Sequence, residues 1–154
     1  MDKQYHPTEI EEKWAKIWSE RKVKNESSTE SFSQVIPPPN VTGTLHMGHS
    51  FQYAIMDFYT RYNHMAGKDS YWQVGSDHAG IATQMVVENN LAKKDITRKD
   101  LGREKFLEEV WSWKDYSEEK ITSQIKRLGN TVDWNKYRFT LDDDFNEAVI
   151  KAFV

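Results

Sequence analysis

The sequence contains no cysteine and no long hydrophobic run, and both absences exclude whole classes of protein. Without cysteine among its 154 residues, the chain can have no disulfide framework, no thiol nucleophile and no thiolate metal site. No run of about 18 apolar residues occurs, and the polar N-terminus from Met1 to His6 lacks the apolar stretch of a signal peptide. We therefore expect a cytoplasmic protein with no membrane partner.

A marked excess of either charge is also missing. The chain has 21 Lys and Arg against 24 Asp and Glu, a formal net charge of −3, whereas a self-sufficient nucleic-acid binder is expected to be basic. If the protein handles nucleic acid, we therefore expect most of the binding surface to lie outside this chain or to be a small local patch on it.

An aromatic content of 13% argues against disorder. The length allows one ordinary domain or part of a larger one.

Hydrophobic spacing and capping residues predict alternating helices and strands. A capping box at Thr8–Glu11 opens a first helix, and Thr97 supplies the N-cap of a long one. A polar connector covers 25–31. The expected helices are 8–21, 46–66, 81–92, 97–128 and one from about 143, and the expected strands are 32–36 and 70–74. This order predicts an α/β fold with parallel strands, helical crossovers and ligands at the carboxyl ends of the strands.

The helix predicted over 46–66 carries apolar residues on two sides, which favours a helix packed within a larger body. One side is marked by Leu45, His49, Gln52, Met56 and Tyr59, and the other by Phe51, Ile55, Phe58 and Tyr62. Gly67 stands where a left-handed C-terminal cap is expected, and Gly129 is expected to end the helix over 97–128.

The junction between the first strand and this helix has the features of a phosphate site. His46 and His49 are three residues apart in the first helical turn, so their rings should point toward the same side. A helix N-terminus adds unpaired N–H groups and partial positive charge. Gly48 lets a flat ligand approach the backbone.

A second loop, Gly75–Gly80, follows the second strand and carries Asp77 toward the same edge of the sheet. A crevice with two imidazoles, a helix N-terminus and a carboxylate suits an anionic nucleotide and a cationic amine. Two other interpretations stay open here. Asp77 could be the N-cap of the helix from Ile81. A histidine cluster of His46, His49 and His78 could hold a metal ion in a hydrolase.

Two long sequence blocks resemble the class I aminoacyl-tRNA synthetases. The first has the signature whose short form is His-Ile-Gly-His, and comprises Pro37 and Pro38 followed by Pro39, Asn40, Val41, Thr42, Gly43, Thr44, Leu45, His46, Met47, Gly48 and His49. The second runs from Trp72 to Gln84, and both look like the valyl-tRNA synthetase family. Similarity continues through 102–106, 127–129 and 133–134. Ser76 departs from the threonine usual in that family.

The resemblance implies the first half of a Rossmann-like nucleotide-binding fold after an N-terminal helix and connector, with boundaries at 1–31 and 32–154. It implies ATP-dependent activation of valine to valyl-adenylate, with ATP as its Mg²⁺ complex, and transfer to tRNA(Val). The implied catalytic residues are His46 and His49. The implied ATP-binding residues are Thr42, His46, Gly48 and His49, and those for valine are Pro37, Pro38, Asn40 and Asp77. No protein-bound metal is implied.

The resemblance also implies that 154 residues are an N-terminal piece of a longer, monomeric enzyme that edits mischarged threonine. The editing domain, the Lys-Met-Ser-Lys-Ser loop and the anticodon-binding helices of the family have no counterpart in this sequence. We expect the piece alone to be inactive. The alternative from the same resemblance is a non-catalytic fragment or paralogue.

Overall fold

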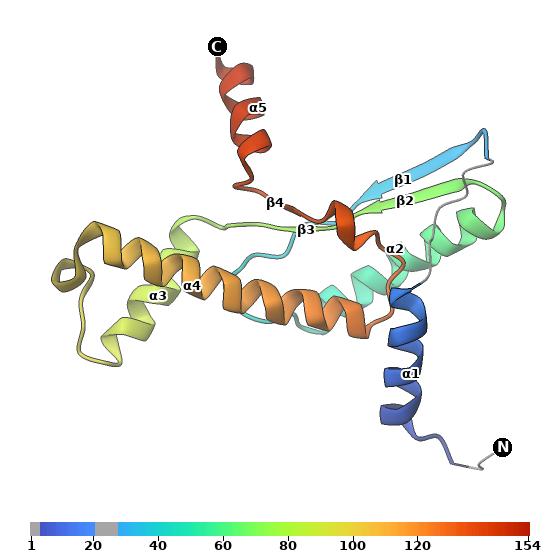
Figure 1. Ribbon diagram of the computed structural model, residues 1–154, viewed down its shortest axis with the longest axis horizontal. Coiled ribbons are helices and arrows are strands. Elements are labelled where there is room, and N and C mark those ends of the chain that lie inside the picture. The colour runs from blue at the N-terminus through green and yellow to red at the C-terminus, as the bar shows by residue number, and fades with distance from the viewer. Residues whose placement is uncertain (1–3, 21–27) are drawn as a thin grey trace. The chain divides into compact units, whose positions relative to one another are not determined.

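The computed structural model describes residues 4–20 and 28–154 (Figure 1). The chain divides into two compact units, each assembled from separate stretches of sequence. Unit 1 contains Met1–Ile36, His46–Gln73 and Ser123–Asn135, and unit 2 contains Pro37–Leu45, Val74–Thr122 and Lys136–Val154.

In unit 1 the first helix, α1, spans Pro7–Ser19. The predicted capping box at Thr8 is wrong, because the N-cap is His6 and no side chain caps the helix. Pro7 occupies the first helical turn, where its fixed φ and missing N–H carry no penalty, and this moves the start before Thr8. Arg21 and residues 25–27 of the predicted connector lie outside the described residues.

The first strands of unit 1 form a parallel pair joined by a helix (Figure 1). β1 (Ser31–Val35) and β2 (Asp69–Gln73) run in register from Ser31 opposite Asp69 to Val35 opposite Gln73, and α2 (Met47–Met65) lies between them in the sequence. The predicted parallel strands with a helical crossover are confirmed. Each element begins and ends within about a residue of its prediction.

The buried face of α2 differs from the two apolar sides that spacing predicted. Its buried residues are Tyr53, Asp57 and Thr60, whereas Phe51 and Phe58 are more than half exposed. Hydrogen bonds make the polar burial possible: Thr131 N–H donates to Asp57 Oδ1 at 2.6 Å. Apolar periodicity missed this face because two of its three buried residues are polar and hydrogen-bonded.

Gly129, after the last turn of α4 (Arg98–Arg127), is confined by both its backbone and its neighbours. Its φ is +71°, and a Cβ there would lie 2.2 Å from the ring of Trp18. Its carbonyl accepts a 2.7 Å hydrogen bond from Arg61 Nη2. The predicted end of the helix at Gly129 is confirmed, and the glycine also admits an aromatic ring from α1.

We expect Gly129→Ala to lower the free energy of unfolding of the chain by about 2–4 kcal/mol, since a left-handed alanine and an overpacked ring each cost about 1–3 kcal/mol. Gly67→Ala is the matched control, because Gly67 has a φ of +89° but nothing within 4 Å of its Cβ position. The loss in free energy of unfolding in Gly67→Ala should reflect the left-handed backbone conformation alone. Urea denaturation of both variants measures the difference, and equal losses would show that Trp18 does not restrict position 129.

Unit 2 holds the remaining strands and a helical hairpin. Its elements are β3 (Gly75–Ser76), α3 (Ile81–Ala92), most of α4, β4 (Arg138–Phe139) and α5 (Asp143–Phe153), while the short 3₁₀ turn Trp134–Lys136 precedes β4. Buried side chains of α3 and α4, namely Val87, Leu91 and Phe106, form a core. α4 is not the continuous helix predicted, because Gly102 interrupts it with φ 74° and ψ 173°.

β3 and β4 pair in parallel, with Gly75 opposite Arg138 and Ser76 opposite Phe139. The loop predicted to start at Gly75 therefore begins with a two-residue strand. Gly75 is required at this pairing, because a Cβ would lie 2.4 Å from the carbonyl oxygen of Arg138.

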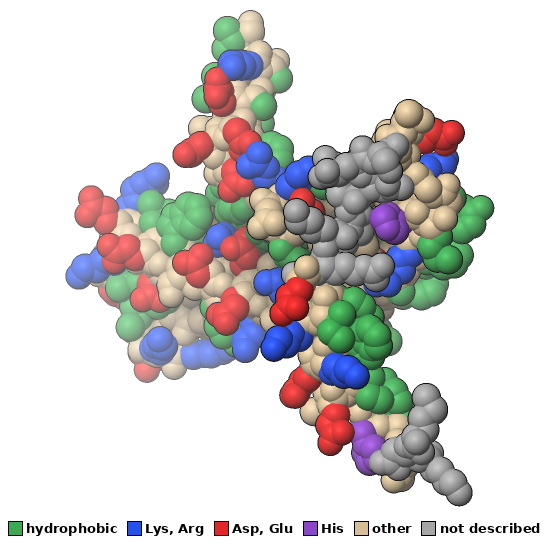
Figure 2. All heavy atoms as spheres, turned by 45° about the vertical axis from the view of Figure 1, so that its right-hand side comes forward, with side chains coloured by type: hydrophobic (Ala, Val, Ile, Leu, Met, Phe, Trp, Pro, Cys, Tyr) green, Lys and Arg blue, Asp and Glu red, His purple; other side chains and the backbone are tan. Residues whose placement is uncertain are grey.

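Figure 2 shows hydrophobic side chains at the surface of α5. Phe145, Val149, Ile150 and Phe153 of this helix are exposed. Among the described residues, no helix combines the length and the apolar character needed to cross a bilayer.

Candidate active site

In unit 1 the two predicted catalytic histidines form a reciprocal capping box at the N-terminus of α2. His46 is the N-cap residue, and its Nδ1 accepts a 3.1 Å hydrogen bond from the Gly48 N–H. In return, Nδ1 of His49 accepts a 3.2 Å bond from the backbone N–H of His46. The ring centroids are 4.0 Å apart. The spacing argument is confirmed in that both rings lie together at the helix start.

This capping fixes the chemical form of both rings. A neutral imidazole has one N–H, so a ring that accepts at Nδ1 carries its proton on Nε2. His46 and His49 therefore each present one Nε2–H donor at the N-terminus of α2. An array of neutral donors at the positive end of a helix dipole is suited to phosphate oxygens.

Gly48 has a local role in this cap. A Cβ at position 48 would lie 2.9 Å from Cε1 and 3.0 Å from Nδ1 of His46. Any side chain would therefore displace the ring that caps the helix. Glycine is required here by the His46 ring itself, whatever ligand approaches the backbone.

Partial burial, and then the neighbouring His46 ring, hold the pKa of His49 below its usual value of 6.5. The ring of Tyr53 lies one turn later with its centroid 6.0 Å from that of His49. Tyr53 is fully buried, and burial raises its own pKa to about 12. His49 is thus neutral at pH 7 and packs against a rigid aromatic ring.

We expect the pKa of His49 to rise toward 6.5 in His46→Asn, because this change removes the electrostatic effect of the His46 ring, the second cause that lowers this pKa, while Asn can still cap the helix. Imidazole resonances followed by NMR titration of the chain measure it, and His6→Asn is the control. Since the folded pKa is lowered, the stability from His49 is present above pH 6.5 and lost as pH falls through the lowered pKa. Titration of His49 at or above pH 6.5 in the unsubstituted chain would contradict the assignment.

In unit 2 the signature loop Pro37–Leu45 pairs with the chain around Asp77. Asp77 N–H donates to the Pro39 carbonyl at 2.9 Å, and Val41 N–H donates to the Asp77 carbonyl at 2.9 Å. These bonds form an isolated parallel bridge between Asn40 and Asp77. Two of the residues predicted to bind valine are therefore adjacent.

Two side chains of α4 anchor this loop, and neither was among the predicted site residues. Trp113 Nε1 donates to the Val41 carbonyl at 2.9 Å, and Ser117 Oγ donates to the Gly43 carbonyl at 2.8 Å. The signal that could have identified both is their spacing of four on a helix, which places them on one face.

The Asp77 carboxylate is held from one side only. Its Oδ1 accepts from the Ala79 N–H at 3.0 Å and from the Thr140 hydroxyl at 3.2 Å. Among the described residues, no hydrogen bond to Oδ2 is found, and about a third of the side chain (36%) is exposed. The N-cap of α3 is Gly80, with no side-chain cap, so the interpretation of Asp77 as a helix cap is wrong.

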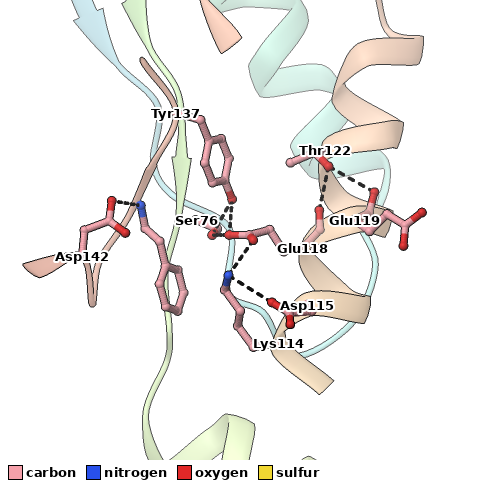
Figure 3. Close-up of polar contacts among 9 residues, drawn as sticks. Ser76, Lys114, Asp115, Glu118, Glu119, Thr122, Tyr137 and Asp142 are labelled. Carbon is pink, nitrogen blue, oxygen red and sulfur yellow. Dashed lines mark hydrogen bonds and ion pairs between the residues drawn. The ribbon is translucent and has the colours of Figure 1, made fainter. Parts of the chain in front are cut away.

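Ser76, immediately before Asp77, belongs to a polar cluster between β3, β4 and α4 (Figure 3). Ser76 is fully buried, and its hydroxyl lies 3.0 Å from Glu118 Oε1 and 2.6 Å from the Tyr137 hydroxyl. Burial raises the pKa of Tyr137. Burial alone would lower the pKa of Lys114, but its 2.7 Å ion pair with Glu118 raises it instead.

The structure distributes the predicted site residues over both units. The histidine pair and Gly48 belong to unit 1, while Pro37, Pro38, Asn40, Thr42 and Asp77 belong to unit 2. In the part of the chain that the structure describes, no three His, Cys, Asp or Glu side chains form a group able to hold a metal ion. Of the three histidines in the hydrolase interpretation, His46 and His49 belong to unit 1 and His78 belongs to unit 2.

Comparison with known proteins agrees on one family. The family model described as "tRNA synthetases class I (I, L, M and V)" matches residues 9–154. The chain is 58% identical over 151 residues, 97% of its length, to the Valine--tRNA ligase of Acinetobacter baylyi, of which it covers 16%. It thus spans about a sixth of that relative.

The fold is also similar to a solved synthetase structure. That structure is the ternary complex of Agrobacterium radiobacter K84 agnB2 LeuRS-tRNA-LeuAMS. The match covers 97% of this chain and 18% of the chain in that structure, with a TM-score of 0.75 and 20% sequence identity. At that identity the likeness concerns the fold alone.

Proposed function

The chain belongs to the class I tRNA synthetases, and on that premise we propose that it forms part of the aminoacylation site of an enzyme that charges tRNA(Val) with valine. The observation that carries the proposal is the 58% identity to a Valine--tRNA ligase across both signature blocks. The substrates would be valine, ATP as its Mg²⁺ complex, and the tRNA. The proposed location is the cytoplasm, where these substrates meet.

In the first step an oxygen of the valine carboxylate attacks the α-phosphorus of ATP in line. A new C(O)–O–P bond forms, the bond from the α-phosphorus to the bridging oxygen breaks, and pyrophosphate leaves with its electrons. Such phosphoryl chemistry requires positioning and charge stabilisation more than covalent catalysis. In the second step a ribose hydroxyl of the tRNA end attacks the valyl carbonyl, and AMP leaves.

We propose that His46 and His49 donate from Nε2 to the phosphate oxygens, where negative charge increases in the transition state. Support comes from the reciprocal cap, in which Nδ1 of each ring accepts a backbone N–H and Nε2 is left to donate. Thr42 and Gly48 would complete the ATP site. Because the rings are held before ATP arrives, little reorganisation accompanies the reaction.

For valine, we propose that Asp77 Oδ2 and the carbonyl of Pro37 accept from the ammonium group, while Pro38 and Asn40 line the side-chain end. The one-sided hydrogen bonding of Asp77 supports this role, because it leaves an acceptor exposed. The rigid lining at Pro38 and Asn40 would exclude the larger side chain of isoleucine by size. Threonine has nearly the same shape and would be rejected only about 10²-fold, so the longer enzyme would need editing.

A chimaera tests the proposal in the context of a whole enzyme. This chain replaces the matching 151-residue segment of the Acinetobacter baylyi Valine--tRNA ligase, and amino-acid-dependent exchange of labelled pyrophosphate into ATP is measured. We expect exchange with valine and little with leucine or isoleucine. A chimaera that melts cooperatively but gives no valine-dependent exchange would overturn the proposal, and so would exchange with another amino acid instead.

A further inference from the structure

Thr140, which lies outside both signature blocks, contacts the predicted substrate-binding loop with its side chain. Pairing of β4 with β3 brings it there: Arg138 N–H donates to the Val74 carbonyl and Thr140 N–H to the Ser76 carbonyl, both at 3.2 Å. The cluster of Tyr137, Ser76 and Glu118 joins the same two strands through the buried Ser76 and two half-buried side chains (Figure 3). Thr140 therefore stands on a firmly held backbone beside Asp77.

The hydroxyl of Thr140 makes three polar contacts. It lies 3.2 Å from Asp77 Oδ1, 2.9 Å from the backbone N of His78 and 2.5 Å from His78 Nδ1. A hydroxyl has one hydrogen and two lone pairs, and an ionised carboxylate only accepts. The hydroxyl hydrogen must therefore go to Asp77 Oδ1. The backbone N–H and the ring Nδ1–H of His78 must then both donate to the Thr140 oxygen.

This assignment determines how Asp77 and His78 present themselves. Asp77 Oδ1 is occupied by Thr140 and by the Ala79 N–H, so that Oδ2 is the oxygen left for a cation. His78 carries its ring proton on Nδ1. Without the hydroxyl, that N–H would still have the Asp77 carboxylate as an acceptor, since Nδ1 lies 3.4 Å from Oδ1.

We propose that Thr140 is a positioning residue, which holds the Asp77 carboxylate in the orientation that binds the substrate ammonium and takes the hydrogen bond of the His78 ring, whose Nδ1 lies 3.4 Å from Asp77 Oδ1. The inference rests on the proposed function, since it takes Asp77 as the ammonium acceptor. Thr140 itself touches no reacting atom. Its effect should therefore appear in valine binding and leave the chemical step nearly unchanged.

Thr140→Val, which keeps the shape and removes the hydroxyl, tests this in the chimaera. We expect the KM for valine in pyrophosphate exchange to rise about tenfold, the size of one hydrogen bond to a charged group, with kcat and the KM for ATP nearly unchanged. Thr140→Ser should restore the KM. Thr122→Val is the matched control, because the Thr122 hydroxyl bonds only to backbone carbonyls of its own helix in the described contacts.

A double-variant cycle distinguishes positioning from a merely structural role. If Thr140 acts through Asp77, Thr140→Val should add almost nothing to the KM of Asp77→Asn. Two results would overturn the inference: increases in KM that add in the double variant, or a KM for valine in Thr140→Val within about twofold of the unsubstituted chimaera. If the unsubstituted chimaera still catalyses valine-dependent exchange, the proposed function is unaffected by either result. Loss of exchange in the unsubstituted chimaera would overturn both.

One measurement is independent of activity. Nitrogen-15 NMR of the histidine rings in the 154-residue chain reports which ring nitrogen carries the proton. We expect His78 as the Nδ1–H form, opposite to His46 and His49, whose capping bonds require Nε2–H. His78 in the Nε2–H form would overturn the assignment of Thr140 directly.

Discussion

His49→Ala in the chimaera should slow valine-dependent pyrophosphate exchange by about 10²–10³-fold, the usual loss for one preorganised transition-state donor. The KM for valine should stay nearly constant, because His49 is proposed to contact the phosphates and not the amino acid. The substitution removes two things together: the Nε2–H donor and the acceptor that caps the His46 N–H at 3.2 Å.

His49→Gln separates these two losses. Its amide oxygen can accept a hydrogen bond and its NH₂ group can donate one, so the loss in exchange should be clearly smaller than in His49→Ala. His6→Ala, at the start of α1, serves as the control for a histidine outside the proposed site. Equal losses in Ala and Gln variants, with a matching fall in the melting temperature, would mean that His49 acts only as a helix cap. A rise in the KM for valine equal to the loss would assign His49 to substrate binding.

The order of elements and the approximate ends of most of them could be predicted from sequence because each rests on local chemistry. The helix over Ile81–Ala92 was predicted with the bounds that the structure has, and the glycine cap at Gly67 has the positive φ expected. Gly102 was missed as a break because a single glycine within a helical pattern is usually tolerated. Its φ of 74° shows that the chain turns there instead.

The proximity of candidate residues could be predicted where they are close in the sequence, and it was missed where strand pairing brings residues together. His46 and His49 meet because three residues separate them on one helix. Thr140 reaches Asp77 only through the two-residue strand β4, which is too short to leave an alternating pattern. Buried polar contacts such as Ser76 with Glu118 are also invisible to hydrophobic periodicity.

The role of Asp77 can be isolated because Asn fits its structural contacts. In Asp77→Asn the amide oxygen can still accept from the Ala79 N–H and the Thr140 hydroxyl, so the melting temperature should hardly change. The negative charge is lost. We expect the KM for valine to rise at least about 30-fold, since losing one partner of a hydrogen-bonded charge pair costs about 2–5 kcal/mol.

Exchange kinetics with valine and with ATP as the varied substrate, together with a thermal melt, test this expectation. Asp143→Asn makes the same change at an exposed position in the first turn of α5 and should leave both KM values unchanged. A normal KM for valine in Asp77→Asn, with a melting temperature far below that of the control, would reduce Asp77 to a loop-stabilising residue. An increased KM for ATP alone would instead assign the carboxylate to the nucleotide. Only a selective increase for valine, without loss of stability, is consistent with an oxygen held on one side by Thr140 and Ala79 and free on the other to bind the ammonium group.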